Sequence, residues 1–214
     1  MPESSSLAVT PTSKSVGSDA SSEPRPFPTQ RFTWDDLVRI IRVERDMAKL
    51  RRCQQDQEYY DRYMGRVRAE YETVTDYILA TKMDIPTQTD PVSGKQVAVP
   101  DREDDTTRDT AYQKRILKND FPYYFELDIE HWILWKWRLG GGDGGGGGVH
   151  DDDGGGNVAI SDAEIEEAKQ RLRQDLGNVI DHLHWVNPPE LKSIPEIDHV
   201  HILVRRRRAD ENAT

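Results

Sequence analysis

Two stretches in the first part of the chain place apolar residues at the spacing of a helix. The stretch "FTWDDLVRIIRVERDMAKL" begins with Thr33 and Asp36, which match an Asp variant of the capping box. Its apolar positions broadly follow helical spacing and are Leu37, Ile40, Ile41, Met47 and Leu50. A second stripe steps by seven, four, three and four residues, through Tyr60, Val67, Tyr71, Val74 and Ile78. The pattern predicts a pair of helices, the second continuous over about residues 55–82.

The strongest β-strand pattern lies in "QKRILKNDFPYYFELDIEHWILWKW". Tyr123–Leu127 and His131–Trp137 carry the aromatic and branched residues that are typical of strands. In the second segment His131, Ile133, Trp135 and Trp137 share one face, while Trp132 and Leu134 share the other. Both faces are apolar for most of this segment, so we expect a central strand that is covered on both sides.

The last third of the chain predicts one further helix and a final strand. Ser161 and Glu164 form a capping box, which starts a helix that runs to about Leu176 and stops at Gly177. A strand is expected near His199–Arg206. The order of elements predicts an α+β fold, with an N-terminal helical pair packed on a small antiparallel sheet and one further helix.

Several segments lack the apolar content of a core. Residues 1–30 hold eight serines and five prolines, and we expect a disordered tail. Residues 84–109 are predicted to be an irregular acidic loop, and residues 140–157 a Gly/Asp low-complexity insert that holds eleven of the fifteen glycines. The polar residues 208–214 complete the chain. These boundaries leave a single interrupted domain over residues 31–207.

Composition narrows the classes of partner. The formal net charge of −10 argues against general affinity for nucleic acid, and no apolar run reaches the length of a membrane span. The lone Cys53 excludes an internal disulfide, which suits a reducing compartment. We therefore expect a cytoplasmic protein. The basic run Arg205–Arg208 leaves access to the nucleus open, although a strand that ends in solvent explains it equally well.

The histidines are the main candidates for chemistry. Four of the six form two His-x-His pairs within twenty residues, His182/His184 and His199/His201. On a strand, both rings of the second pair project to one face about 6–7 Å apart. His131 belongs to another strand of the same predicted sheet, so three histidines converge if register allows.

Three interpretations of the pairs remain open. In the first, the histidines are sheet residues that local hydrogen bonds satisfy, and no cofactor is needed. In the second, His199 and His201 are catalytic in a pocket for a phosphorylated sugar or nucleotide. Its ligand-binding residues would be His131, Asn187, Ser193 and Arg205, with Arg205 as the anion partner. In the third, zinc is bound by His182, His184, His199 and His201.

Five sequence blocks resemble a known family. They are "TWDDLVRII", "YILATKM", "ILKNDFPYYFELDIEHWILWKW", "WVNPPELKSIP" and "HVHILVRR". Over residues 32–206 the chain is similar to the fungal N-acetylglucosamine-induced protein family, a domain of unknown biochemical function. The resemblance implies a nutrient or cell-wall response protein, for which we expect a non-catalytic binding or regulatory role.

Two blocks are also similar to the histidine-triad superfamily of nucleotide hydrolases and transferases. "PYYFELDIEHWILWK" resembles its first strand pair, and "KSIPEIDHVHILVRR" its Ser-φ-Pro and His-φ-His-φ-His segment. That resemblance implies a histidine nucleophile that attacks phosphorus. The chain supplies two of the three histidines: Leu203 holds the third place if His199 is first, and Ile197 the first place if His199 is in the middle. The nucleophile is His201 in one register and His199 in the other.

Overall fold

A computed structural model describes residues 26–99, 112–138 and 159–207. Its elements, in chain order, are α1 (Trp34–Val38), η1 (Arg39–Glu44), η2 (Met47–Lys49), α2 (Gln54–Glu70), α3 (Val74–Lys82), β1 (Thr87–Thr89), β2 (Gln96–Ala98), β3 (Tyr112–Lys118), β4 (Ile129–Arg138), α4 (Asp162–Leu176), β5 (Val179–Trp185), η3 (Pro189–Leu191) and β6 (Asp198–Arg206). The α+β class predicted from the sequence is confirmed.

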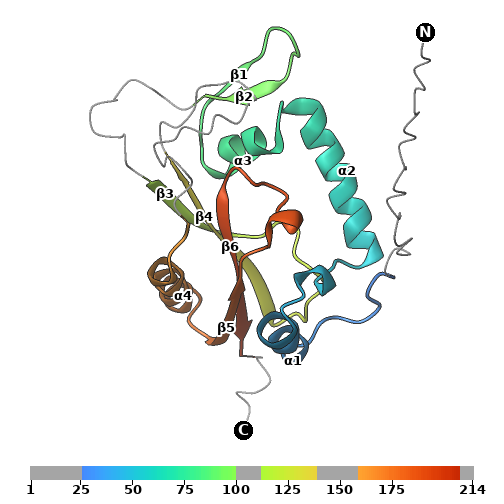
Figure 1. The fold of residues 1–214 in the computed structure, drawn as a ribbon, viewed down its shortest axis with the longest axis vertical. Helices are drawn as coiled ribbons and strands as arrows, with labels where there is room; N and C mark the ends of the chain where they lie inside the picture. Colours follow the sequence, from blue (N-terminus) through green and yellow to red (C-terminus); the bar gives the residue numbers. More distant parts are fainter. Residues whose placement is uncertain (1–25, 100–111, 139–158, 208–214) are drawn as a thin grey trace, which may run out of the picture.

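The main sheet has four antiparallel strands in the order β3-β4-β6-β5 (Figure 1). Its two central strands, β4 and β6, pair over eight positions, from Ile129 opposite Arg205 to Lys136 opposite Asp198. Both strands are buried on both faces along most of their length, so the sheet is covered on both sides. A separate two-stranded sheet pairs β1 with β2.

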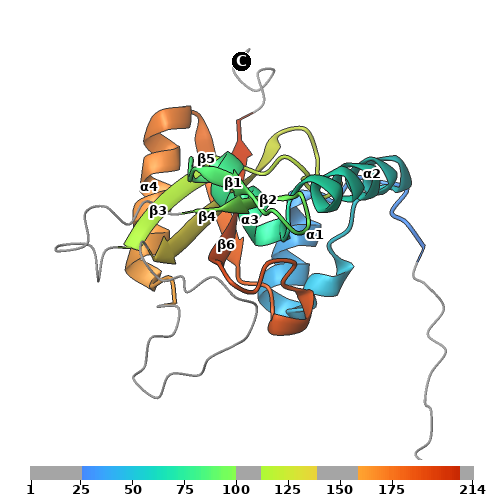
Figure 2. The same ribbon diagram turned by 90° about the horizontal axis from the view of Figure 1, so that it is seen from above.

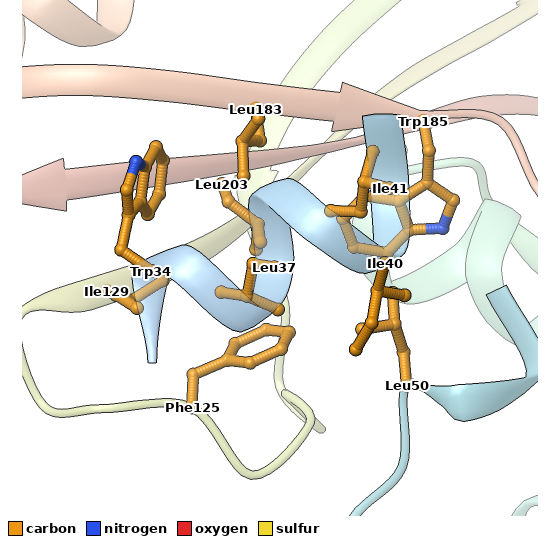
Figure 3. Close-up of a cluster of buried hydrophobic side chains, with 10 residues drawn as sticks. All are labelled: Trp34, Leu37, Ile40, Ile41, Leu50, Phe125, Ile129, Leu183, Trp185 and Leu203. Atoms are coloured by element: carbon orange, nitrogen blue, oxygen red, sulfur yellow. The ribbon is translucent and has the colours of Figure 1, made fainter. Parts of the chain in front are cut away.

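The helices cover the two faces of this sheet unequally (Figure 2). On the first face, α1 and η1 pack against β5 and β6, and their joint apolar cluster is drawn in Figure 3. Residues of α2 and α3 pack on the same face of β4, against Ile133, Trp135 and Trp137. The opposite face packs on α4 through Leu134, Val200, Ile202 and Val204. The predicted division of apolar residues between the two faces of β4 and β6 is thus confirmed.

The predicted helical pair is interrupted at two places. Arg45 has a left-handed backbone with φ of 54°, so the first helix ends after the π-helical η1. The second helix is divided into α2 and α3, which corrects the prediction of one continuous helix. The break lies where Thr73 caps α3 in a capping box with Asp76, and where Tyr71 forms a β-bridge with Gln96. The apolar stripe continued across this break because both helices face the same cluster.

The predicted strand at Tyr123–Leu127 is wrong. The strand that precedes β4 and pairs with it is β3, which begins at Tyr112, eleven residues before Tyr123. The segment between Lys118 and Ile129 connects β3 to β4. Phe125 instead packs into the cluster of Figure 3 and bridges to Phe32. The aromatic residues of this segment therefore reflect its packing against the core and not membership of a strand.

The acidic connection begins with regular structure. Within residues 84–99, β1 and β2 form a hairpin whose turn is held by Asp90, because its carboxylate accepts hydrogen bonds from the N–H groups of Val92 and Ser93. This corrects the prediction of an irregular loop for these residues. The remainder of that loop, the glycine insert at 140–157 and most of both predicted tails lie outside the described residues.

The predicted capping box of α4 is confirmed, and its carboxylate has a second role. Glu164 accepts hydrogen bonds from Ser161 and lies 3.0 Å from Nζ of Lys136, a lysine of β4 that is only 6% exposed. Burial by itself would raise the pKa of Glu164, but the Ser161 hydrogen bonds and the Lys136 charge lower it to about 2. The capping carboxylate thus neutralises a buried cation of the sheet.

Replacing Glu164 with glutamine is expected to destabilise the protein by about 2 kcal/mol at pH 7, because Lys136 loses its nearest counter-charge. The folded pKa of Glu164 lies below its ordinary value of 4.5, so the carboxylate stabilises the fold above about pH 4.5 and this contribution is lost as pH falls towards 2. Urea unfolding at pH 7 and pH 3 measures both effects. Glu167→Gln removes an exposed partner of Lys114 and is expected to change stability by less than about 0.5 kcal/mol; equal losses in the two variants would contradict the prediction.

Candidate functional site

The pairing of β4 with β6 brings three histidines together on the face that carries α1, α2 and α3. Ile133 lies opposite His201 and Trp135 lies opposite His199, so His131 is diagonal to His201 on the same face. His131 Nε2 lies 2.9 Å from His201 Nδ1. The rings of His199 and His201 are nearly perpendicular, with centroids 5.4 Å apart. All three side chains are buried.

Two asparagines extend the His131–His201 pair at its ends. Asn119 Nδ2 lies 3.1 Å from His131 Nδ1, and Asn187 Nδ2 lies 3.1 Å from His201 Nε2. Trp185 stacks on His201 with centroids 4.7 Å apart and an angle of 10° between the planes. Every ring nitrogen of this pair therefore has a partner within the protein.

His199 has a different arrangement. Its Nδ1 lies 2.9 Å from the carbonyl oxygen of Ile197, which only accepts, so Nδ1 carries the proton of the neutral ring. Nε2 therefore bears a lone pair, and it makes no hydrogen bond to any described residue. Burial lowers the pKa of His199, although the Ile197 carbonyl offsets part of that effect. The ring is thus neutral at pH 7, with an available nitrogen lone pair.

Beside these histidines lies a cavity of about 120 Å³. His199 and His201 line it together with Asn119, Asn187 and Ser193, and its wall also includes Tyr60, Tyr77, Phe121, Tyr123 and Trp135. Pockets for whole drug-sized ligands usually measure about 300–1,000 Å³. The cavity therefore accommodates one small polar group, and the rest of a larger ligand would lie outside it.

Arg52 supplies a cation to the same cavity. It precedes α2, its Nε and Nη2 donate to the carbonyl of Phe121 at 3.1 and 2.8 Å, and its guanidinium lies over the ring of Tyr60. Burial lowers the pKa of this guanidinium. The charges of Asp61 and Asp56 act on Arg52 from a distance. No carboxylate forms a direct ion pair with it in the part of the chain that the structure describes, and a half-buried arginine without such a pair suits a bound anion.

The structure brings together most of the predicted site, but not all of it. Asn187 and Ser193 line the cavity, and His131 lies behind His201. Arg205, the predicted anion partner, lies elsewhere: it is 3.9 Å from a carboxylate oxygen of Asp128 and is not part of the cavity wall. The arginine that lines the cavity is Arg52.

The predicted four-histidine zinc set is not formed. His182 pairs with Val204 and His184 with Ile202, so these two histidines belong to the face that packs on α4. His199 and His201 belong to the other face, and the sheet separates the pairs. Within residues 26–99, 112–138 and 159–207, no group of three or more His, Cys, Asp or Glu side chains is placed to hold a metal ion.

Two residues of the site were missed from sequence. Arg52 stands in a dibasic pair before a helix, a pattern without a specific chemical meaning. Asn119 precedes Asp120 and Phe121 in a turn, and its Oδ1 accepts from the N–H of Phe121. Neither residue carries a local signal of contact with the histidines, because that contact depends on tertiary packing.

A second, larger hollow of about 400 Å³ lies between α4 and the strands β3 and β4. Its charged groups neutralise one another, as Lys114 pairs with Glu164 and Glu167, and Arg171 pairs with Asp175. No histidine is among its described lining residues, so the smaller cavity is the candidate site. No helix in the described ranges combines the length and apolar character that crossing a membrane requires.

Comparisons with known proteins relate the chain to one family and to one solved structure. None of the curated proteins matches the chain. One solved structure, described as "Crystal Structure of HTC1", is similar with 25% sequence identity and a TM-score of 0.45, and the match covers 84% of this chain and 90% of that chain. The model of a family described as "Protein of unknown function (DUF3605)" matches residues 33–205. That match spans most of the 214 residues, and the chain belongs to the DUF3605 family.

Proposed function

We propose that this protein is a histidine-dependent hydrolase or transferase that acts on phosphorylated or nucleotide-linked substrates, with His199 as the nucleophile. The observation that carries the proposal is the contact between His199 Nδ1 and the carbonyl oxygen of Ile197. That carbonyl only accepts, so we infer that the proton is on Nδ1 and that the lone pair of Nε2 is free beside the cavity. His201 does not serve this role, because both of its ring nitrogens are engaged by His131 and Asn187.

The chemistry proceeds by two displacements at phosphorus. His199 Nε2 attacks phosphorus and forms an N–P bond, and the leaving group departs with its electron pair and takes a proton from solvent. Water or an acceptor hydroxyl then attacks the same phosphorus and releases its proton to solvent, and the N–P bond breaks with its electron pair returning to Nε2, so the neutral ring of His199 is restored. This assignment corresponds to the histidine-triad register in which His199 is the middle residue and Ile197 takes the first place.

Arg52 supports recognition of the phosphoryl group. Arg52 lines the cavity and makes no direct ion pair with a described carboxylate, although the charges of Asp61 and Asp56 act on it, so a bound anion would be its first direct counter-charge. The small volume of the cavity favours entry of the phosphoryl group alone. The nucleoside or sugar portion would then lie outside, against the exposed rim, which includes Ser193.

The first substrates to test are sugar phosphates and nucleotide-linked sugars. The sequence blocks that resemble N-acetylglucosamine-induced proteins motivate this choice, and phosphorylated amino sugars belong at the head of the panel. The lone Cys53 suits a reducing compartment, and we place the reaction in the cytoplasm.

The proposal is tested by trapping the covalent intermediate. The full chain is incubated with a panel of nucleoside phosphates, nucleotide sugars and sugar phosphates, quenched in alkali, in which phosphoramidates persist, and analysed by peptide mass spectrometry. The expected adduct is on His199 and is absent from the His199→Ala variant. Saturable binding of a panel member without any adduct or turnover would overturn the proposal and favour a non-catalytic binding role.

A further inference from the structure

Four side chains form a buried row beside the cavity. We call it the histidine relay, and its members in order are Asn119, His131, His201 and Asn187. The three contacts between neighbours measure 3.1, 2.9 and 3.1 Å. At such distances each contact needs one proton between a donor and an acceptor. The distribution of protons along this row decides which group His201 presents to a ligand.

The two amides at the ends of the relay have fixed orientations. Asn119 Oδ1 accepts from the backbone N–H of Phe121 at 2.9 Å, and Asn187 Oδ1 accepts from the indole N–H of Trp185 at 2.9 Å. Both of these partners only donate, so turning either amide would set two donors against each other. Both Nδ2 groups therefore face the imidazoles as donors.

The relay consequently contains one proton more than its contacts can hold. Donors at both ends require lone pairs on His131 Nδ1 and His201 Nε2, which leaves only the inner contact for a ring proton. Burial, together with the Arg52 charge, lowers the pKa of His131 to about 3, and burial holds the pKa of His201 well below its ordinary value. Both rings are thus neutral at pH 7, and two neutral imidazoles carry two N–H protons. One of them must lie against an asparagine donor.

The surroundings of the two ends decide where this extra proton lies. The His131 ring is packed between Tyr123, Phe125 and Trp185, does not line the cavity, and is only 2% exposed. An unsatisfied N–H at that end would carry the full cost of desolvation. His201 and Asn187 both line the cavity, where an acceptor can reach them.

We propose that Asn119 and His131 are positioning residues that hold His201 in its Nε2–H form, and that His201 Nε2–H and Asn187 Nδ2–H together bind an oxygen of a phosphoryl anion. The protons run in one direction, from Asn119 to His131 Nδ1 and from His131 Nε2–H to His201 Nδ1. His201 Nε2–H and an Asn187 N–H are then neighbouring donors on nitrogens 3.1 Å apart, and an oxygen placed beside both nitrogens would accept from both. This inference deepens the proposed function, because it makes His201 a donor to the anion while His199 supplies the lone pair.

The tautomer of His201 tests the inference directly. Nitrogen-15 NMR of the full chain at pH 8, with labelled histidine assigned through His131, His199 and His201 single variants, distinguishes the Nε2–H ring from the Nδ1–H ring. The wild-type protein is expected to show His201 in the Nε2–H form, and inorganic phosphate is expected to shift the Nε2 resonance saturably. In the wild-type protein, an Nδ1–H ring at His201, or a His201 signal that phosphate does not shift, would overturn the inference.

The Asn119→Asp substitution is expected to reverse the direction of the hydrogen bonds along the histidine relay, and the two side chains have nearly the same shape. The new carboxylate accepts a proton from His131 Nδ1, so His131 Nε2 accepts from His201, and His201 Nε2 becomes an acceptor for Asn187. We expect the His201 tautomer to switch to Nδ1–H and the affinity for inorganic phosphate to fall at least about tenfold, because a hydrogen bond to a charged group is lost.

Ser193→Asp is the matched control for charge. It places a carboxylate on the cavity wall without touching the relay, so it weakens phosphate binding but leaves His201 in the Nε2–H form. A tautomer switch in both variants, or in neither, contradicts the inference.

The experiments distinguish failure of the proposed function from failure of this inference. A phosphate-sensitive Nε2–H ring without any adduct on His199 removes the proposed function alone, and an adduct on His199 with an Nδ1–H ring at His201 removes this inference alone.

Discussion

Replacing His199 with alanine is expected to lower turnover of phosphorylated substrates by at least about 10³-fold, since loss of a nucleophile removes the covalent route. The side chain lies at the wall of the cavity, and its one hydrogen bond to a described residue is that from Nδ1 to the carbonyl of Ile197. The variant leaves that carbonyl without its partner, which costs about 1–3 kcal/mol of stability. Steady-state kinetics on the substrate found by the panel measure the first effect, and urea unfolding measures the second.

The control for this variant is His184→Ala. His184 belongs to the same protein and is half-buried, but it lies on the opposite face of the sheet beside α4. Its replacement is expected to leave turnover within about threefold of the wild type, because nothing in the cavity depends on it. If His199→Ala retained more than a tenth of the wild-type rate, His199 would not be the nucleophile.

Replacing Leu203 with alanine is expected to produce the largest loss of stability, about 3–5 kcal/mol. Leu203 is 0% exposed and lies opposite His131 on β4 and Leu183 on β5. It belongs to the apolar cluster through which α1 and η1 pack on the sheet, together with Leu37. The cavity left by a truncated leucine in such a rigid setting cannot fully collapse, so both the transfer and the cavity contributions are lost.

Urea unfolding followed by tryptophan fluorescence measures this loss, with Leu191→Ala as the control. Leu191 ends a short 3-10 helix and is 37% exposed, so its truncation is expected to change stability by less than about 1 kcal/mol. A loss below about 1 kcal/mol for Leu203→Ala would show that α1 and η1 are not docked through this residue. The result also bears on function, because Leu203 occupies one of the two places at which a third triad histidine would stand.

The sequence alone was sufficient for features whose determinants lie within a few residues. The capping boxes at Thr33 and Ser161 each satisfy backbone donors three residues away, so the residue letters specify both helix starts. The period of two in β6 placed His199 and His201 on one face and Val200 and Ile202 on the other. Side-chain alternation along a strand is a property of the backbone and needs no partner strand.

The predictions were wrong where the same apolar pattern is compatible with two different kinds of secondary structure. Tyr123 and Phe125 are packed as predicted for core residues, but they belong to a connection and not to a strand. Likewise the apolar stripe from Tyr60 to Ile78 runs across the break between α2 and α3, because both helices pack on the same side of β4. Hydrophobic patterning reports which residues meet the core, while hydrogen-bond pairing decides which element they form.

Only the tertiary structure decided the candidate site. The register of β4 against β6 sets His131 within hydrogen-bond distance of His201, and the order of strands places His182 and His184 on the far face from His199. Arg52 lines the same cavity as His199 and His201, although it is distant from both of them in the sequence. Strand register and helix docking are set by the summed packing of many distant residues, whereas a sequence pattern records only the preferences of near neighbours. The sequence therefore determined that the histidines share a face, and the fold determined which of them keeps a free nitrogen.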